Sequence, residues 1–373
     1  MCIIDFIGMV IAKYSSRPSI TEGVSELLQL VSYEGSRMES GLQWKERDSY
    51  LCNVKALLIF LVIVGHLLEC KLENEWICVL YKIIYSIHMP LFAYTTGLGI
   101  KNSCQCKKQC ISSLRLYLFI QGSLVLVSCL TKGSRYSLLT PYWHLWFLLA
   151  MVWWSLTGRF CLYLKGKGVP LAVLVLGAMA GACICGNFPQ IGRFLSLSRA
   201  IVFFPYYLMG MYSSAWLFQG KRGWCSLAVL PGVLGICYII SHISYVFLYQ
   251  AAGFGSRGFW LGVIGRLICM VTAVSIGILI LGWMPRRRLP WTRLGIDTLP
   301  VYILHVLFVP FAEPLYDLFG RTVPVAGILA VLIMTGIYGL TRFHRPVCRL
   351  YERKKLTFST KSIQPGTRQR NLL

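Results

Sequence analysis

The hydrophobic positions of this chain gather in long runs from residue 50 onward, and short polar stretches separate them. A run of about 20 apolar residues can cross the roughly 30 Å hydrocarbon core of a bilayer as an α-helix. The loops between the runs leave no room for a soluble domain. The pattern predicts an all-α polytopic membrane protein with about ten transmembrane helices. The expected spans are residues 50–69, 76–100, 113–131, 142–158, 168–186, 197–217, 224–248, 257–282, 297–317 and 323–341.

The first expected span carries a stripe of polar residues. Asp48, Lys55 and His66 are spaced so that, on a helix advancing about 100° per residue, they project from nearly one face. A lysine inside a span costs roughly 2.5–3.5 kcal/mol on insertion scales, so it calls for a partner, a ligand or a wet cavity. The simpler interpretation is a lysine that extends to the interface beside a packed histidine.

Histidines in the expected spans are candidates for proton transfer. Histidine takes a proton from a hydroxyl near neutral pH, which makes His66 and His88 candidate general bases. A packing role with a hydrogen bond to a neighbouring helix explains His88 equally well. His144 and Trp146 begin the fourth span, where they form either a substrate-binding wall or an interfacial aromatic belt.

Three further residues lie deep in later spans. Tyr302 and His305 share the ninth span, and packing and substrate binding are equally open for both. Arg266, in the eighth span, is an intramembrane cation that meets an anionic ligand group or pairs with a carboxylate. We count all three as candidate substrate-binding residues.

The distribution of charged residues predicts how the spans are oriented in the membrane. The chain is 56% hydrophobic and 14% charged, with a net charge of +23. In a soluble protein this excess would suggest nucleic acid as a partner, but here most Lys and Arg residues lie in loops on one side and in the tails. Because cytoplasmic loops are enriched in Lys and Arg, we expect both termini to be cytoplasmic. We expect the protein to lie in the cell membrane. We expect a cytoplasmic extension at 1–45, the membrane domain at 46–342 and a basic cytoplasmic tail at 343–373.

The cysteines do not indicate a disulfide framework. There are 15 of them at scattered spacings, many inside apolar runs. Only Cys104, Cys106 and Cys110 cluster, and no fourth ligand is evident beside them, so we expect no metal. The chain also has no P-loop, no strand-associated G-x-G-x-x-G and no G-x-S-x-G. Any chemistry must therefore take place within the helix bundle.

Five sequence blocks in this order resemble the integral membrane acyltransferase-3 family, especially the branch similar to fucose 4-O-acetylases. They are the Lys55-x10-His66 spacing within an "LVIVGH" ending, "IHMPLFAYTTG" at 87–97, "HLWFLLA" at 144–150, "FFPYYLMG" at 203–210 and "GIDTLPVYILH" at 295–305. The resemblance implies a ten-span core, acetyl-CoA or a related cytoplasmic acyl donor, and a carbohydrate or glycolipid acceptor at the outer face. The family's arginine-x10-histidine motif falls on Lys55 and His66, so lysine replaces the arginine.

Two hypotheses follow. The first is an O-acetyltransferase in which His66 is the general base, with Lys55, Asp48 and His88 as the other candidate catalytic residues. The second is a non-catalytic transporter or sensing module, since the same fold is similar to the membrane portion found with some serine racemases. In that case the polar stripe is a pathway for solute.

Overall fold

The computed structural model describes residues 49–361, except 131–136, 189–190, 214–221, 252, 254–257 and 297, and it describes only the backbone of 343–361. Within these ranges the chain is helical and contains no strand, as the sequence predicts. The helices are α3 (Ser49–Leu68), α4 (Glu75–Leu98), α5 (Ser103–Leu130), α6 (Trp146–Gly166), α7 (Leu171–Ile184), α8 (Leu197–Tyr212), α9 (Arg222–His242), α10 (Tyr245–Leu248), α11 (Phe259–Trp283), α12 (Thr298–Leu318) and α13 (Val323–Lys361). The polytopic all-α fold class is confirmed.

Nine of the described helices are long and apolar enough to cross a membrane. The fifth expected span forms α7, which has only 14 residues and continues as a 3-10 turn to Asn187. At 1.5 Å per residue α7 is about 21 Å long, short of a bilayer core. The expected seventh span is also divided. α9 ends at His242, and Ser244 caps the separate α10 by accepting a hydrogen bond from the backbone N–H of Phe247.

α5 begins ten residues before the expected third span. Its first turn is capped by Asn102, whose Oδ1 accepts a hydrogen bond from the backbone N–H of Gln105 at 2.9 Å. The cysteines of the C-x-C-x3-C cluster therefore lie within the first eight residues of one helix. In the part of the chain that the structure describes, no group of three or more His, Cys, Asp or Glu side chains is arranged to hold a metal ion.

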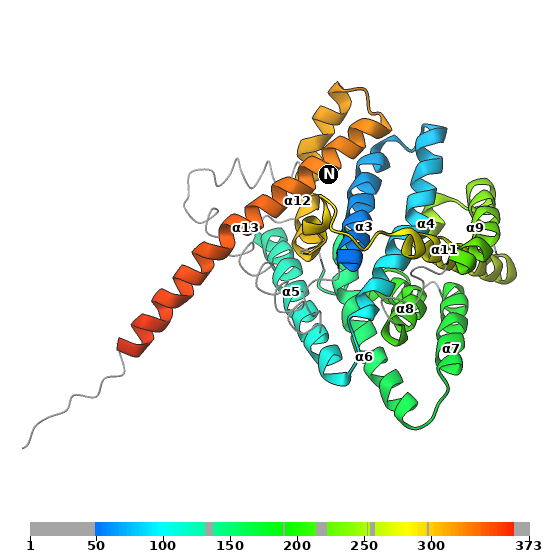
Figure 1. Ribbon diagram of the computed structural model, residues 1–373, viewed down its shortest axis with the longest axis horizontal. Helices are drawn as coiled ribbons and strands as arrows, with labels where there is room; N and C mark the ends of the chain where they lie inside the picture. Colours follow the sequence, from blue (N-terminus) through cyan, green and yellow to red (C-terminus); the bar gives the residue numbers. More distant parts are fainter. Residues whose placement is uncertain are drawn as a thin grey trace, which may run out of the picture.

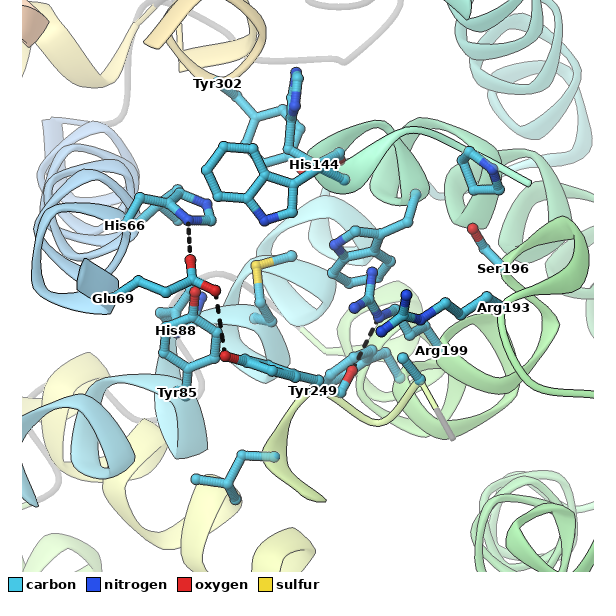
Figure 2. A pocket seen from close by; sticks show the side chains of 18 of the residues that line it. His66, Glu69, Tyr85, His88, His144, Arg193, Ser196, Arg199, Tyr249 and Tyr302 are labelled. Atoms are coloured by element: carbon cyan, nitrogen blue, oxygen red, sulfur yellow. Dashed lines mark hydrogen bonds and ion pairs between the residues drawn. The ribbon is translucent and has the colours of Figure 1, made fainter. Parts of the chain in front are cut away.

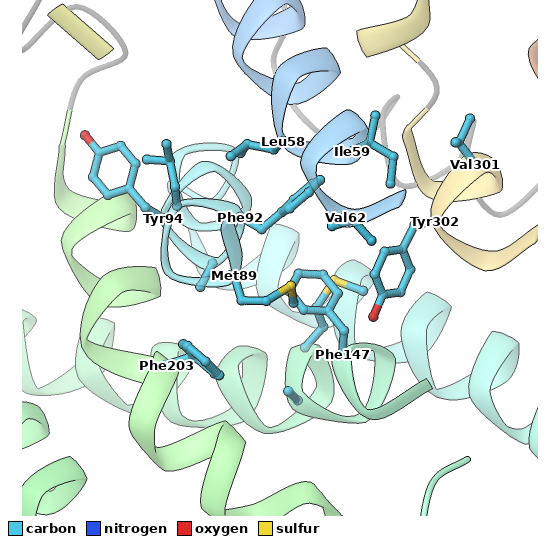
Figure 3. Packing of buried hydrophobic residues seen from close by; sticks show 14 of the residues in the cluster. Leu58, Ile59, Val62, Met89, Phe92, Tyr94, Phe147, Phe203, Val301 and Tyr302 are labelled. Carbon is cyan, nitrogen blue, oxygen red and sulfur yellow. The ribbon is translucent and has the colours of Figure 1, made fainter. Parts of the chain in front are cut away.

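α3 lies at the centre of the bundle, with α4 beside it, α12 and α13 on another side, and α9 and α11 beyond α4 (Figure 1). Most of its residues are buried, which suits a helix that is apolar on all sides. Leu58, Ile59 and Val62 of α3 face the side chains of α4 and α6 in the core (Figure 3). The polar residues of α3 are thereby held within the protein.

α4 and α8 cross with their backbones in contact. A Cβ atom added at Gly97 would collide with the backbone carbonyl of Tyr207, and one at Gly210 would collide with the carbonyl of Tyr94. Small residues allow this approach, and close packing is the main force that holds helices together in lipid. The crossing sets the position of both helices relative to α3.

Candidate active site

A cavity of about 250 Å³ lies where the end of α3, the middle of α4, the start of α8 and three connecting segments converge (Figure 2). One carboxylate, two arginines and three histidines give the cavity a polar wall, and aromatic rings supply most of the rest. The lining residues used below are His66, Glu69, Tyr85, His88, Trp143, His144, Trp146, Arg193, Ser196, Arg199, Tyr249 and Tyr302. The structure therefore brings together five of the nine candidate residues from the sequence: His66, His88, His144, Trp146 and Tyr302.

His66 is paired with a carboxylate. Its Nδ1 lies 3.4 Å from Oε2 of Glu69, one turn later on the same helical segment, and only 12% of the His66 side chain is exposed. A carboxylate beside Nδ1 favours the tautomer that carries its proton there. The Nε2 atom then has the free lone pair, which is the form needed to accept a proton.

Glu69 is held in turn by a tyrosine, which itself contacts a second tyrosine. The Tyr249 hydroxyl donates to Oε1 of Glu69 at 3.3 Å and lies 2.9 Å from the Tyr81 hydroxyl. Burial raises the pKa of Tyr249 to about 12, so its phenol is protonated at neutral pH and can donate. The arrangement orients the carboxylate toward His66 (Figure 2).

His88 lies on α4 at another part of the same wall. Its Nδ1 is 2.7 Å from the backbone carbonyl of Ile84, and since a carbonyl only accepts, Nδ1 must carry the proton. Its ring meets that of Tyr85 edge to face, with centroids 4.8 Å apart. His88 thus has a packing contact and a position on the cavity wall at once.

The other two membrane histidines pack behind His66. The His305 ring stacks on His66 with centroids 5.3 Å apart and meets His144 at 5.8 Å. His305 itself is fully buried. The Tyr302 hydroxyl donates to the backbone carbonyl of His144 at 2.5 Å, which ties α12 to the segment that precedes α6.

Two candidates, Lys55 and Arg266, lie elsewhere. Lys55 is half-buried and, at three turns from His66, about 16 Å along α3. Arg266 is buried away from the cavity, where its Nε donates to Oε1 of Gln250 at 3.0 Å and its Nη1 donates to the carbonyl of Ala182 at 2.7 Å. These contacts make Arg266 a link between α11, α7 and the segment at Gln250. Asp48 lies outside the described residues.

Sequence reasoning missed Glu69 and Arg199. Glu69 follows His66 by three residues, a spacing that places two side chains on one face of a helix, and this spacing is the signal that could have found it. Arg199 was not among the candidates. In the structure its guanidinium lies 4.8 Å from the ring centre of Trp146, and its Nε donates to the carbonyl of Tyr249 at 2.9 Å.

Apolar helices long enough to cross a membrane, packed around a polar cavity, define a polytopic membrane protein, and a histidine–carboxylate pair lies in the cavity wall. The model of the acyltransferase-3 family, described as an acyltransferase domain, matches residues 48–342. The chain belongs to this family.

Similarity to individual proteins is limited to a short stretch. The nodulation protein NolL of Sinorhizobium fredii (strain NBRC 101917 / NGR234) is 42% identical over 55 residues, which make up 14% of this chain and 15% of NolL. No solved structure matches the chain. The finer resemblance to fucose 4-O-acetylases stays a prediction.

Proposed function

We propose that this acyltransferase transfers an acetyl group from acetyl-CoA to a hydroxyl of a carbohydrate or glycolipid. The observation that carries the proposal is the His66–Glu69 pair in the wall of the cavity. Acyl transfer to a sugar hydroxyl needs a proton acceptor at the reacting oxygen, and a neutral histidine with its Nδ1 held by a carboxylate provides one.

One histidine then serves both proton transfers of the reaction. The acceptor hydroxyl gives its proton to Nε2 of His66 while its oxygen attacks the thioester carbonyl carbon. The carbon–sulfur bond breaks in the resulting tetrahedral intermediate, and the leaving sulfur takes the proton back from His66. Glu69 stabilises the positive charge that His66 carries between the two steps.

A second cavity supports entry of the donor from the opposite side. It measures about 300 Å³, is almost wholly apolar, and lies between α4, α7, α8 and α11. Its lining includes Tyr94 and Ser213, at the far ends of α4 and α8 from the first cavity. Met89 lines the first cavity, and its neighbour Pro90 lines the second. We propose that the acyl-bearing arm of the donor occupies this second cavity.

Substituting Gly277 by leucine tests the route of the donor. Gly277 lines the second cavity, and a Cβ there would make only an ordinary contact with Leu91 at 3.6 Å, so the larger side chain can fit while occupying the space. We expect the KM for acetyl-CoA to rise about tenfold or more, with little change in the KM for the acceptor. Gly336→Leu is the control, because Gly336 on α13 has no atom near its Cβ position. An unchanged KM for acetyl-CoA in Gly277→Leu would remove the donor from this cavity.

For the cell membrane we propose the orientation with both termini cytoplasmic, since it places the positively charged loops inside. Single cysteines introduced into a background without native cysteines should react with an impermeant reagent from outside at position 138 and should not react at position 287. Reaction at position 287 in intact cells would reverse the orientation.

The activity itself is tested with purified full-length protein and acetyl-CoA labelled in the acetyl group. Transfer of label to a glycan acceptor supports the proposal. The competing function, movement of an unmodified solute, is tested with the same protein in sealed vesicles. Solute uptake without transfer of label would favour a transporter.

A further inference from the structure

One part of the cavity wall is positively charged and has no assigned role in proton transfer. Arg193 and Arg199 both line the cavity at the start of α8 (Figure 2). They lie close enough for the charge of Arg193 to act on Arg199. Among the described residues, no carboxylate forms an ion pair with either arginine. The one acidic residue in the lining, Glu69, is engaged by His66 and Tyr249.

Arg199 is held so that one edge of its guanidinium remains for a ligand. Its Nε is occupied by the carbonyl of Tyr249, and its flat face rests on the Trp146 ring. In the part of the chain that the structure describes, neither Nη atom donates a hydrogen bond. The planar edge of arginine matches the two oxygens of a carboxylate or phosphate.

Ser196 adds an independent observation. It lines the same cavity, is only 2% exposed, and its hydroxyl finds no hydrogen-bond partner among the described residues. A buried hydroxyl without a partner is costly, so a ligand oxygen is the partner that this position calls for.

The backbone at this position is strained. Leu195 and Ser196 have φ of 49° and 56°, in the left-handed region that disfavours side chains. Leu195 is held there by two hydrogen bonds: its N–H donates to the carbonyl of Leu139 at 2.7 Å, and its carbonyl accepts from Nε1 of Trp153 at 3.0 Å. Such strain persists where the surroundings enforce it, often at a ligand site.

From these observations we infer that the acceptor is acidic: Arg199, Arg193 and Ser196 bind a carboxylate or phosphate of the acceptor while its hydroxyl lies at His66. The inference rests on the proposed acyl transfer and adds the chemical class of the acceptor. The same oxygens are also found on the donor's phosphates. We assign the site to the acceptor because it lies at the start of α8, whereas the apolar cavity lies along the second half of that helix.

Binding to the purified full-length protein tests the inference without acyl transfer. The probes are glucuronate and glucose 6-phosphate, each compared with glucose, and the signal is the fluorescence of the cavity tryptophans. We expect at least one charged sugar to bind about tenfold or more tightly than glucose, and Arg199→Gln to remove most of that difference. Ser196→Ala should weaken binding of the same sugar by a smaller factor. Arg321→Gln is the matched control, since Arg321 pairs with Asp317 outside the cavity.

Binding of coenzyme A tests whether the anion at this site belongs to the acceptor or to the donor. Its affinity should be unchanged in Arg199→Gln, and it should bind together with the charged sugar. If Arg199→Gln weakens coenzyme A and leaves both charged sugars unaffected, the site belongs to the donor and the inference is overturned. Equal binding of charged and neutral sugars, or no binding of any of them, also overturns it.

The outcome is distinguishable from that of the proposed function. Arginine-dependent binding of a charged sugar with no transfer of labelled acetyl groups would leave the anion site standing and reject the acyl transfer. Transfer to neutral acceptors at rates that Arg199→Gln does not change would retain the acyl transfer and reject the acidic acceptor.

Discussion

Replacing His66 by glutamine is expected to lower acetyl transfer by about 10²–10⁴-fold, the usual contribution of a positioned general base. Glutamine has roughly the same reach and can still donate a hydrogen bond to Glu69, but it cannot take up a proton near neutral pH. The variant should therefore insert and fold normally. The measurement is the rate of acetylation per mole of membrane-inserted protein.

Two further histidine variants make this experiment specific. His88→Gln should lose less activity, because the Nδ1 of His88 bonds a neutral backbone carbonyl, whereas the carboxylate of Glu69 stabilises the positive charge that His66 acquires as a base. His242→Gln should lose none, since His242 is exposed at the end of α9 and stacks on Tyr238 outside the cavity. A larger loss in His88→Gln than in His66→Gln would assign the base to α4, and full activity in His66→Gln would reject the mechanism.

Replacing Gly97 by alanine is expected to destabilise the fold by about 3 kcal/mol or more, the upper range for overpacking. The added Cβ would meet the backbone carbonyl of Tyr207, which cannot rotate away as a side chain would. α4 and α8 would have to separate, and both help to form the two cavities. The measurement is the melting temperature of the protein in detergent, together with the fraction that elutes as a folded species.

For the control substitution we expect unchanged or higher stability. Gly336 lies on an exposed face of α13 with no atom within 4 Å of its Cβ position. Gly336→Ala should leave stability unchanged or raise it by up to about 1 kcal/mol, because alanine favours helix more than glycine does. A Gly97→Ala protein as stable as Gly336→Ala would show that the helix crossing tolerates a side chain.

The bounds of a helix could be predicted from the sequence where they depend only on the length of a local apolar run. The first two spans were expected at 50–69 and 76–100, and α3 and α4 occupy Ser49–Leu68 and Glu75–Leu98. Apolar length decides these boundaries, because an exposed backbone cannot be tolerated in lipid. The breaks were harder to predict. The end of α9 before Ser244 depends on a single cap inside an apolar stretch, and hydropathy averaged over a whole span does not detect it.

The sequence by itself determined the fold class, the approximate spans, the family resemblance and the selection of His66 as the candidate general base. Only the tertiary structure decided which polar side chains meet. Tyr249 reaches Glu69 across 180 residues of sequence, and Arg266 takes its partners from α7 and Gln250, away from the cavity. The physical reason is that hydropathy places a segment in the membrane, whereas the rotation of each helix about its axis is set by packing against its neighbours. That rotation determines whether a buried cation lines the cavity, as Arg199 does, or joins helices, as Arg266 does.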